Sequence, residues 1–196
     1  MKPKHIALIQ GHPDPQTTHF GHALATAYAQ GAQQAGHAVK TVTVAQLDFP
    51  LLRTKTDFET GTPPPAIQEA QDVIRWADHL VILYPLWLGG MPALLKGFFE
   101  QVFRPALTSG AGQTGPGAPQ LLKGKSARIV VTMGMPAPLY RWFFGAHSLK
   151  SLERNVLGLV GIGPLKETLI GQVESPDARK RAAWLAKLEA LGQAGA

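Results

Sequence analysis

The chain has 196 residues, of which 45% are hydrophobic and 16% charged, a composition typical of one soluble globular domain with a sizeable core. It contains no cysteine, which excludes disulfides, thiolate catalysis and cysteine-ligated zinc or iron–sulfur centres. The net charge of +6 comes from scattered basic residues without interleaved aromatic residues, so it favours a phosphate-bearing cofactor over nucleic acid.

The amino-terminal residues 1–5 lead straight into a strand-like segment with no apolar signal region, which predicts a cytoplasmic protein. The longest uncharged stretch, Leu80–Leu95, is interrupted by proline and glycine and is too short for a membrane-spanning helix. There is neither an internal repeat nor a domain linker, so we expect residues 1–196 to form a single domain.

In chain order, the first half begins with a buried strand at His5–Gln10 and a helix at Thr18–Gln34. An alternating, β-branched strand follows at Val39–Val44. We expect a long polar connection at Gln46–Pro65 and then a helix at Ala66–Trp76.

The second half opens with a fully buried strand at His79–Leu83 and a helix with a broad apolar stripe that begins at Pro92 and ends near Phe103. The segment Thr108–Gln120, rich in glycine and proline and free of charge, is expected to be a loop or lid. A strand, a helical stretch, a strand and a last helix complete the pattern at Ser126–Thr132, His147–Leu159, Leu165–Ile170 and Pro176–Leu191.

Five strands that alternate with five helices predict an α/β fold, a doubly wound five-stranded parallel sheet with helices on both faces. Ligands of such sheets bind beyond the carboxyl ends of the strands, at the switch point of the strand order. The candidate site therefore lies in three loops, at Gly11–Thr18, Tyr84–Gly90 and Met133–Arg141.

The first loop opens directly into a helix, and hydroxyl groups and free amides at a helix amino terminus bind phosphate. His12, Thr17 and Thr18 are therefore candidate phosphate ligands. The alternative is an ordinary threonine N-cap preceded by turn prolines. The G-x-G-x-x-G fingerprint of dinucleotide-binding folds is absent from this loop.

The segment Tyr84–Phe103, with the sequence YPLWLGGMPALLKGFFEQVF, resembles the NAD(P)H:quinone oxidoreductases related to DT-diaphorase and the modulator-of-drug-activity proteins. The order of elements matches that flavodoxin-like family over nearly the whole chain. The resemblance implies flavin contacts from Pro85, Leu86, Trp87 and Leu88. The alternative is that Trp87 and Leu88 only pack in the core.

The other two loops also resemble family segments. The stretch His12–Phe20 is similar to the flavin-phosphate loop, which adds two residues, His19 and Phe20, to the expected flavin contacts. The third loop is similar to the turn against the other flavin edge, and it implies contacts from Thr132, Met133, Gly134 and Tyr140.

By the same resemblance, Tyr140 and His147 match a catalytic tyrosine and histidine, the latter only if one residue is inserted. Groups of this kind stabilise a reduced flavin or protonate the acceptor. The alternative is that Tyr140 is a packing residue and His147 a residue at a helix amino terminus.

The chain departs from the family pattern at Leu88, which stands where an aromatic residue is common and is followed by Gly89 and Gly90. The departure suggests a roomier acceptor pocket. A second departure is Met135, which replaces a glycine after the fourth strand.

His19 and His22 lie three residues apart with His12 nearby, but no further ligand is evident from the spacing, so we expect no metal site. No nucleophile elbow of the G-x-S-x-G type is present, which argues against a hydrolase.

The resemblance implies an enzyme that passes hydride from NADPH or NADH through FMN, or alternatively FAD, to a quinone-like acceptor by a ping-pong mechanism. It also implies a homodimer with the flavin site at the interface. Two alternatives stay open, an FMN-dependent azo- or nitroreductase and a flavin-binding accessory subunit that associates peripherally with a membrane transporter.

Overall fold

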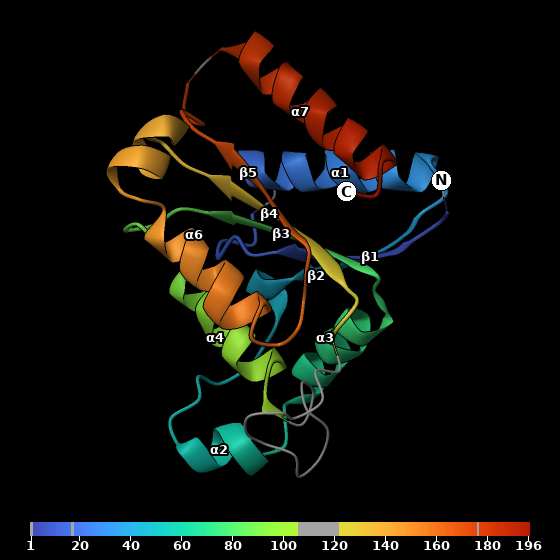
Figure 1. Ribbon diagram of the computed structural model, residues 1–196, viewed down its shortest axis with the longest axis vertical. Helices are drawn as coiled ribbons and strands as arrows, with labels where there is room; N and C mark the ends of the chain where they lie inside the picture. The colour runs from blue at the N-terminus through green and yellow to red at the C-terminus, as the bar shows by residue number, and fades with distance from the viewer. Residues whose placement is uncertain (1, 17, 106–121, 176) are drawn as a thin grey trace.

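The computed structural model describes residues 2–16, 18–105, 122–175 and 177–196, and the predicted loop at Thr108–Gln120 lies outside them. Five strands form one sheet in the order β2-β1-β3-β4-β5, and every neighbouring pair is parallel (Figure 1). The strands are β1 (His5–Gln10), β2 (Ala38–Thr43), β3 (His79–Pro85), β4 (Ser126–Thr132) and β5 (Leu165–Ile170). The predicted doubly wound, flavodoxin-like sheet is confirmed.

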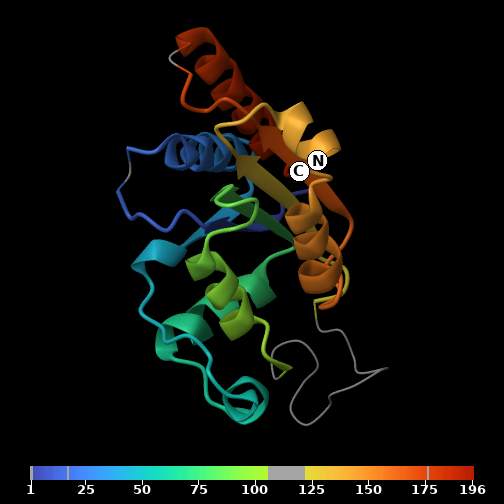
Figure 2. The same cartoon turned by 90° about the vertical axis from the view of Figure 1, so that its left-hand side faces the viewer.

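Helices cover both faces of the sheet (Figures 1 and 2). On one face lie α1 (Phe20–Gln34) and α7 (Ala178–Gln193), and on the other lie α3 (Pro65–Trp76), α4 (Ala93–Val102) and α6 (His147–Ser151). Side chains alternate along β1, so Ile6 and Leu8 join the core under α1 and α7, while Ala7 and Ile9 join the core on the opposite face. Strands buried on both faces account for the continuous apolar runs of the sequence.

The helices α1 and α7 come from opposite ends of the chain and pack closely on each other. A Cβ added to Gly31 of α1 would overlap the carbonyl oxygen of Glu189 in α7. A Cβ added to Gly192 of α7 would overlap the carbonyl oxygen of Tyr28 in α1. Glycine at both positions therefore lets the two helix backbones touch.

The connection Gln46–Pro65, expected as a long polar segment, contains a short helix, α2 (Lys55–Thr60). The hydroxyl oxygen of Thr54 accepts a hydrogen bond from the Asp57 amide at 3.0 Å, which caps the helix start. The helix has no buried residues and therefore no apolar stripe in the sequence, so the capping threonine was the only local sign of it. A 3₁₀ turn, η1 (Val44–Gln46), lies just after β2.

The helical stretch expected at His147–Leu159 is two elements, α6 and the π-helical η3 (Leu152–Leu157). A second π-helical turn, η2 (Leu139–Phe143), precedes α6, and Gly145 and Ala146 between them have φ of +65° and +47°. Apolar spacing alone does not distinguish α from π turns, because the two differ only in which carbonyl each amide reaches.

Helix ends also differ slightly from expectation. The first helix begins at Phe20 rather than Thr18, and the last begins at Ala178 because Asp177 is its N-cap. Across the described ranges, no helix combines the length and the apolar character needed to cross a membrane.

Candidate functional site

A cleft with a volume of about 420 Å³ opens at the carboxyl ends of the central strands, where the switch-point rule places ligand sites. Its walls come from the loop after β1, the loops after β3 and β4, and the connection from β5 to α7. The lining residues are His12, Thr18, His19, Phe20, Gly21, Pro85, Leu86, Trp87, Thr132, Met133, Gly134, Val173, Glu174 and Arg181.

The structure thus brings together all the predicted cofactor-binding residues that it describes, except two. Leu88 and Tyr140 do not line the cleft, and neither does His147. Thr17 lies outside the described residues. Four lining residues, Gly21, Val173, Glu174 and Arg181, were not predicted from the sequence.

One end of the cleft is the amino terminus of α1. His19 occupies the N-cap position, but its side chain makes no capping hydrogen bond, and the first turn of the helix contains no acidic residue. The first amides of a helix lack partners within the helix, so they attract an anion. Thr18 lies beside them on the cleft wall. This end fits a phosphate group.

Three histidines surround the loop that leads into α1. The rings of His12 and His19 stack with their centroids 4.2 Å apart, and the His22 ring lies 5.6 Å from that of His12. Asp14 holds them, because its Oδ2 lies 2.8 Å from His19 Nε2 and its amide donates to His12 Nδ1 at 3.1 Å. In the part of the chain that the structure describes, no group of three or more His, Asp or Glu side chains is placed to hold a metal ion.

The cluster sets the charge of its members. Burial, and then the neighbouring His19, lower the pKa of His12 below its ordinary value. The pKa of Asp14 is also lowered, first because its carboxylate accepts a hydrogen bond from the Gln16 amide and then because it accepts one from His19. Asp14 is therefore an anion at neutral pH, and the lowered pKa of His12 favours its neutral form even with Asp14 beside it.

Gln10, the last residue of β1, positions this loop and was not identified from the sequence. Its side chain is buried, donates from Nε2 to the Gly21 carbonyl at 3.2 Å, and accepts from the His12 amide at 3.2 Å. It thereby ties the end of β1 to both the loop and the first turn of α1. The sequence did contain a sign of this role, because Gln10 is a polar residue at the end of an otherwise apolar strand, and a buried polar side chain needs hydrogen-bond partners.

The apolar side of the cleft is a tight hairpin after β3. The amides of Trp87 and Gly90 each bond the other's carbonyl oxygen at 2.9 Å, and the turn residues Leu88 and Gly89 have φ of +46° and +77°. The Leu86 amide bonds the Thr132 carbonyl at 2.7 Å. The amides of Leu86 and Trp87 are therefore already used within the chain, which leaves side chains, rather than these amides, to face a ligand. Leu88 is fully exposed.

The opposite side is formed by residues from distant parts of the chain. Thr132 and Met133 are buried at the end of β4, and Gly134 exposes its backbone to the cleft. Arg181 of α7 lies over the Phe20 ring, 4.3 Å from its centroid, and donates to the Val173 carbonyl at 3.3 Å. A permanent cation therefore stands near the amino terminus of α1.

Tyr140 and His147 lie away from this cleft. Tyr140 is buried in the core, and its hydroxyl lies 2.8 Å from Ser148 Oγ. His147 is exposed as the first residue of α6, with its ring against Gly145. These positions match the structural alternative for both residues.

The cleft fits a flavin in size and chemistry. Its lining combines the amino terminus of α1 and cationic or titratable side chains with the apolar residues Pro85, Leu86 and Trp87, and the Trp87 ring lies 6.2 Å from that of His12. Its volume falls within the range of cofactor pockets, about 300–1,000 Å³. A phosphate with a flat, largely apolar ring attached matches this combination.

The sheet order and the position of the cleft define a protein of the flavodoxin class. The chain belongs to the Flavodoxin_2 family, described as flavodoxin-like fold, whose model matches residues 4–191.

Two curated relatives illustrate the family. An uncharacterized NAD(P)H oxidoreductase from Haemophilus influenzae is 29% identical over 185 residues, which is 91% of this chain and 89% of that protein. The glutathione-regulated potassium-efflux system ancillary protein KefG from Salmonella gallinarum is 30% identical over 141 residues, 72% of this chain and 64% of KefG.

Solved structures show the same fold. An NAD(P)H:quinone oxidoreductase from Methanothermobacter marburgensis has a TM-score of 0.79 at 22% identity, and the match covers 98% of this chain and 96% of that one. An FMN-dependent NADH-azoreductase from Bacillus anthracis, in complex with FMN, has a TM-score of 0.73 at 14% identity, with 97% and 98% covered.

Proposed function

We propose that the protein is a flavin-dependent oxidoreductase that transfers a hydride from NADPH or NADH to a quinone-like acceptor. The observation that carries the proposal is the cleft itself, whose lining combines the amino terminus of α1 with apolar side chains. Relatives that are named NAD(P)H oxidoreductase and quinone reductase support the reaction class.

The residues of the cleft would hold FMN, our first choice, or FAD. The first amides of α1, with Thr18, His12 and Thr17, would bind the phosphate, and Arg181 would add a permanent positive charge. His19 and Phe20 would stand beside the phosphate, while Pro85, Leu86 and Trp87 would line the ring and keep water away from it. Leu88 remains a proposed flavin contact, from the exposed turn outside the cleft. Thr132, Met133 and Gly134 would form the opposite edge. A bound flavin supplies the capacity to accept and return a hydride.

Because one cleft would serve both reactants, we propose ping-pong kinetics, in which the oxidised nicotinamide leaves before the acceptor enters. We also propose a cytoplasmic homodimer of single-domain chains. A molecular mass from light scattering that equals one chain would contradict the dimer.

A spectrum of the purified protein tests the central proposal. We expect it to carry or take up FMN or FAD with flavin absorbance bands, and to oxidise NADPH or NADH when menadione is present. A colourless protein that takes up neither flavin would refute the proposal. Rapid turnover of an azo dye or a nitroarene, with no turnover of menadione, would favour the azo- or nitroreductase alternative, which the similarity to an azoreductase also supports.

The similarity to KefG supports a second candidate, an accessory subunit associated with a membrane transporter. Flavin uptake without oxidation of NADPH or NADH by any acceptor would favour this function over catalysis.

Tyr140 and His147 remain proposed catalytic residues, and the Tyr140 hydroxyl lies 2.8 Å from Ser148 Oγ. We expect Tyr140→Phe and His147→Gln each to lower kcat with menadione about tenfold or more. Ser148→Ala is the matched control, because it releases the tyrosine hydroxyl without removing it. Unchanged kcat in Tyr140→Phe, with a loss of stability, would assign Tyr140 to packing alone.

A further inference from the structure

A turn after β4 carries a group of large apolar side chains that face solvent. In η2 and the residue after it, four such side chains are exposed, at 42% for Leu139, 78% for Trp142, 78% for Phe143 and 50% for Phe144. The rings of Phe143 and Phe144 meet edge to face with their centroids 5.0 Å apart. Single exposed apolar residues are common on proteins, but a contiguous group marks a surface that contacts another molecule. We refer to these four side chains as the aromatic turn.

The backbone holds the aromatic turn in this outward position. Tyr140, within the same segment, is buried, and the Phe144 amide bonds the Leu139 carbonyl oxygen at 3.2 Å. Arg141 forms an ion pair with Glu167 of β5. Tyr140 and Arg141 thus anchor the segment, so its apolar side chains point outward from a fixed backbone.

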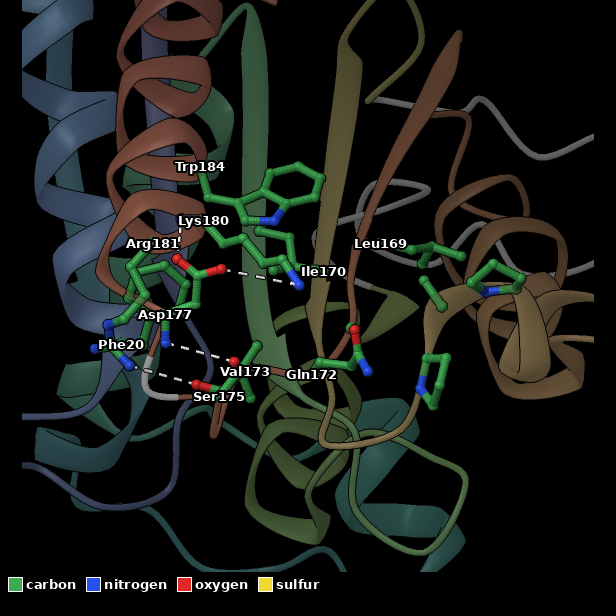
Figure 3. A pocket seen from close by; sticks show the side chains of 14 residues that line it. Phe20, Leu169, Ile170, Gln172, Val173, Ser175, Asp177, Lys180, Arg181 and Trp184 are labelled. Carbon is green, nitrogen blue, oxygen red and sulfur yellow. Dashed lines mark hydrogen bonds and ion pairs between the residues drawn. The ribbon is translucent and has the colours of Figure 1, made fainter.

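The aromatic turn lies at the edge of the molecule where the cleft opens. Since β3 and β4 are parallel, the hairpin after β3 and η2 after β4 reach the same edge of the sheet (Figures 1 and 2). The hairpin adds Leu88, which is fully exposed, and Trp87, which is half-exposed. Pro138, the N-cap of η2, lines a cavity of about 250 Å³ that shares lining residues with the cleft (Figure 3). Exposed apolar side chains therefore project from two loops beside the cleft.

Cations accompany the aromatic turn. Lys150 of α6 and Arg154 of η3 are exposed and form no salt bridge with any residue that the structure describes. Two carboxylates lie nearby, since Glu167 pairs with Arg141 and Glu153 is within electrostatic range of all three cations. Three cations against two carboxylates leave a net positive charge beside the turn, and the whole chain carries +6.

This combination fits the surface of a bilayer. Aromatic side chains insert at the boundary between lipid headgroups and acyl chains, and lysine and arginine attract acidic lipids. A hydrocarbon layer accepts a projecting group of rings without a matching pocket. A two-fold contact between copies of the aromatic turn would instead bring Lys150 and Arg154 against their own counterparts.

We infer that the aromatic turn docks the protein on membranes that contain acidic phospholipid. Its rings would enter the boundary region, Lys150 and Arg154 would lie over the headgroups, and the cleft would open towards the bilayer. The inference goes beyond the proposed function and needs no bound flavin. Under the proposed function, an acceptor dissolved in the bilayer would meet the cleft at this edge.

Vesicle binding by the full chain tests the inference. The probes are vesicles of phosphatidylcholine alone and vesicles of an equal mixture of phosphatidylcholine and phosphatidylglycerol, and co-sedimentation measures the apparent Kd. We expect binding to the acidic vesicles to be about fivefold or more tighter, and added salt to weaken it.

A double variant removes the apolar contact. We expect Trp142→Gln combined with Phe143→Gln to raise the apparent Kd for the acidic vesicles about tenfold or more. Leu51→Gln is the matched control, because Leu51 is exposed but lies in the connection after β2, and it should change the Kd less than about twofold. Circular dichroism verifies that the variants are folded.

The charge and the depth of insertion have separate readouts. Lys150→Glu should raise the Kd about threefold or more, whereas Lys123→Glu, at an exposed lysine just before β4 and so at the opposite edge of the sheet, should change it less than about twofold. Trp142→Phe keeps the apolar surface, so binding should persist while the blue shift of tryptophan fluorescence on binding decreases.

The inference is overturned if the protein binds neither kind of vesicle, or if the double variant binds as tightly as wild type. It is also overturned if wild type binds no vesicles and the double variant converts a dimer to a monomer in light scattering, because the aromatic turn would then be a contact between copies. A protein that binds acidic vesicles through the aromatic turn but takes up no flavin would support this inference and refute the proposed function.

Discussion

His79 is a buried histidine at the start of β3 whose charge affects stability. Its Nδ1 lies 2.8 Å from Ser126 Oγ, while its Nε2 is buried without a hydrogen-bond partner among the described residues. Burial, together with nearby Lys4, Arg128 and Lys166, lowers its pKa to about 4. His79 is therefore neutral in the folded protein near pH 7.

This pKa gives a prediction for acid stability. His79 becomes protonated below about pH 6.5 in the unfolded chain but only near pH 4 in the folded protein. Protonation therefore favours the unfolded chain, so the free energy of unfolding has its full value above pH 6.5 and decreases as the pH falls towards 4. We expect this residue to account for a loss of about 2–3 kcal/mol between pH 7 and 4.5. Urea unfolding at the two pH values should show a smaller loss in His79→Gln than in wild type. His5→Gln, at an exposed histidine, is the control and should leave the loss unchanged.

His12 gives a second prediction, which concerns cofactor binding. Burial and His19 lower its pKa in the free protein, and a phosphate dianion beside it would raise that pKa again. Binding would then take up a proton, so the affinity for FMN should rise about threefold or more as the pH falls from 8 to 6.5. Flavin fluorescence titrations measure the Kd. The same pH dependence in His12→Gln would show that His12 does not contact the phosphate.

The contact between α1 and α7 makes a prediction at the scale of elements. Gly31→Ala places a methyl group against the backbone of α7, so the helices must separate, and we expect a loss of about 1–3 kcal/mol in the free energy of unfolding. Gly21→Ala, also in α1, places its Cβ more than 4 Å from every described residue beyond its chain neighbours and its own helix backbone, and it should be neutral or stabilising by up to about 1 kcal/mol. Equal denaturation midpoints for the two variants would contradict the close packing.

Elements with strong local signals could be predicted from the sequence. The bounds of β1 and β4 agree with expectation because both contain a continuous run of apolar or β-branched residues. The bounds of β5 also agree, although this strand includes Lys166 and Glu167. The start of the last helix was predicted two residues too early, because Asp177 is the N-cap and the helix begins at the next residue. α2 was missed because its stability comes from a cap rather than from an apolar stripe.

At the scale of the whole molecule, residues of the cleft that follow the strand ends could be predicted, because parallel strands bring their carboxyl ends to one edge. Arg181 could not, because its place in the cleft depends on how α7 crosses α1, and no sequence spacing encodes that angle. Leu86 and Trp87 could be placed, but the use of their amides by Thr132 and Gly90 depends on the hairpin geometry.

The crossing of α7 over α1 also affects the point in synthesis at which the walls of the cleft are complete. The phosphate loop after β1 is made early, but the wall that contains Val173 and Arg181 is made late. A nascent chain paused after β5 would lack this wall, so its cleft would be open on that side. Under the proposed function, a flavin bound at that stage would lack its contact with Arg181.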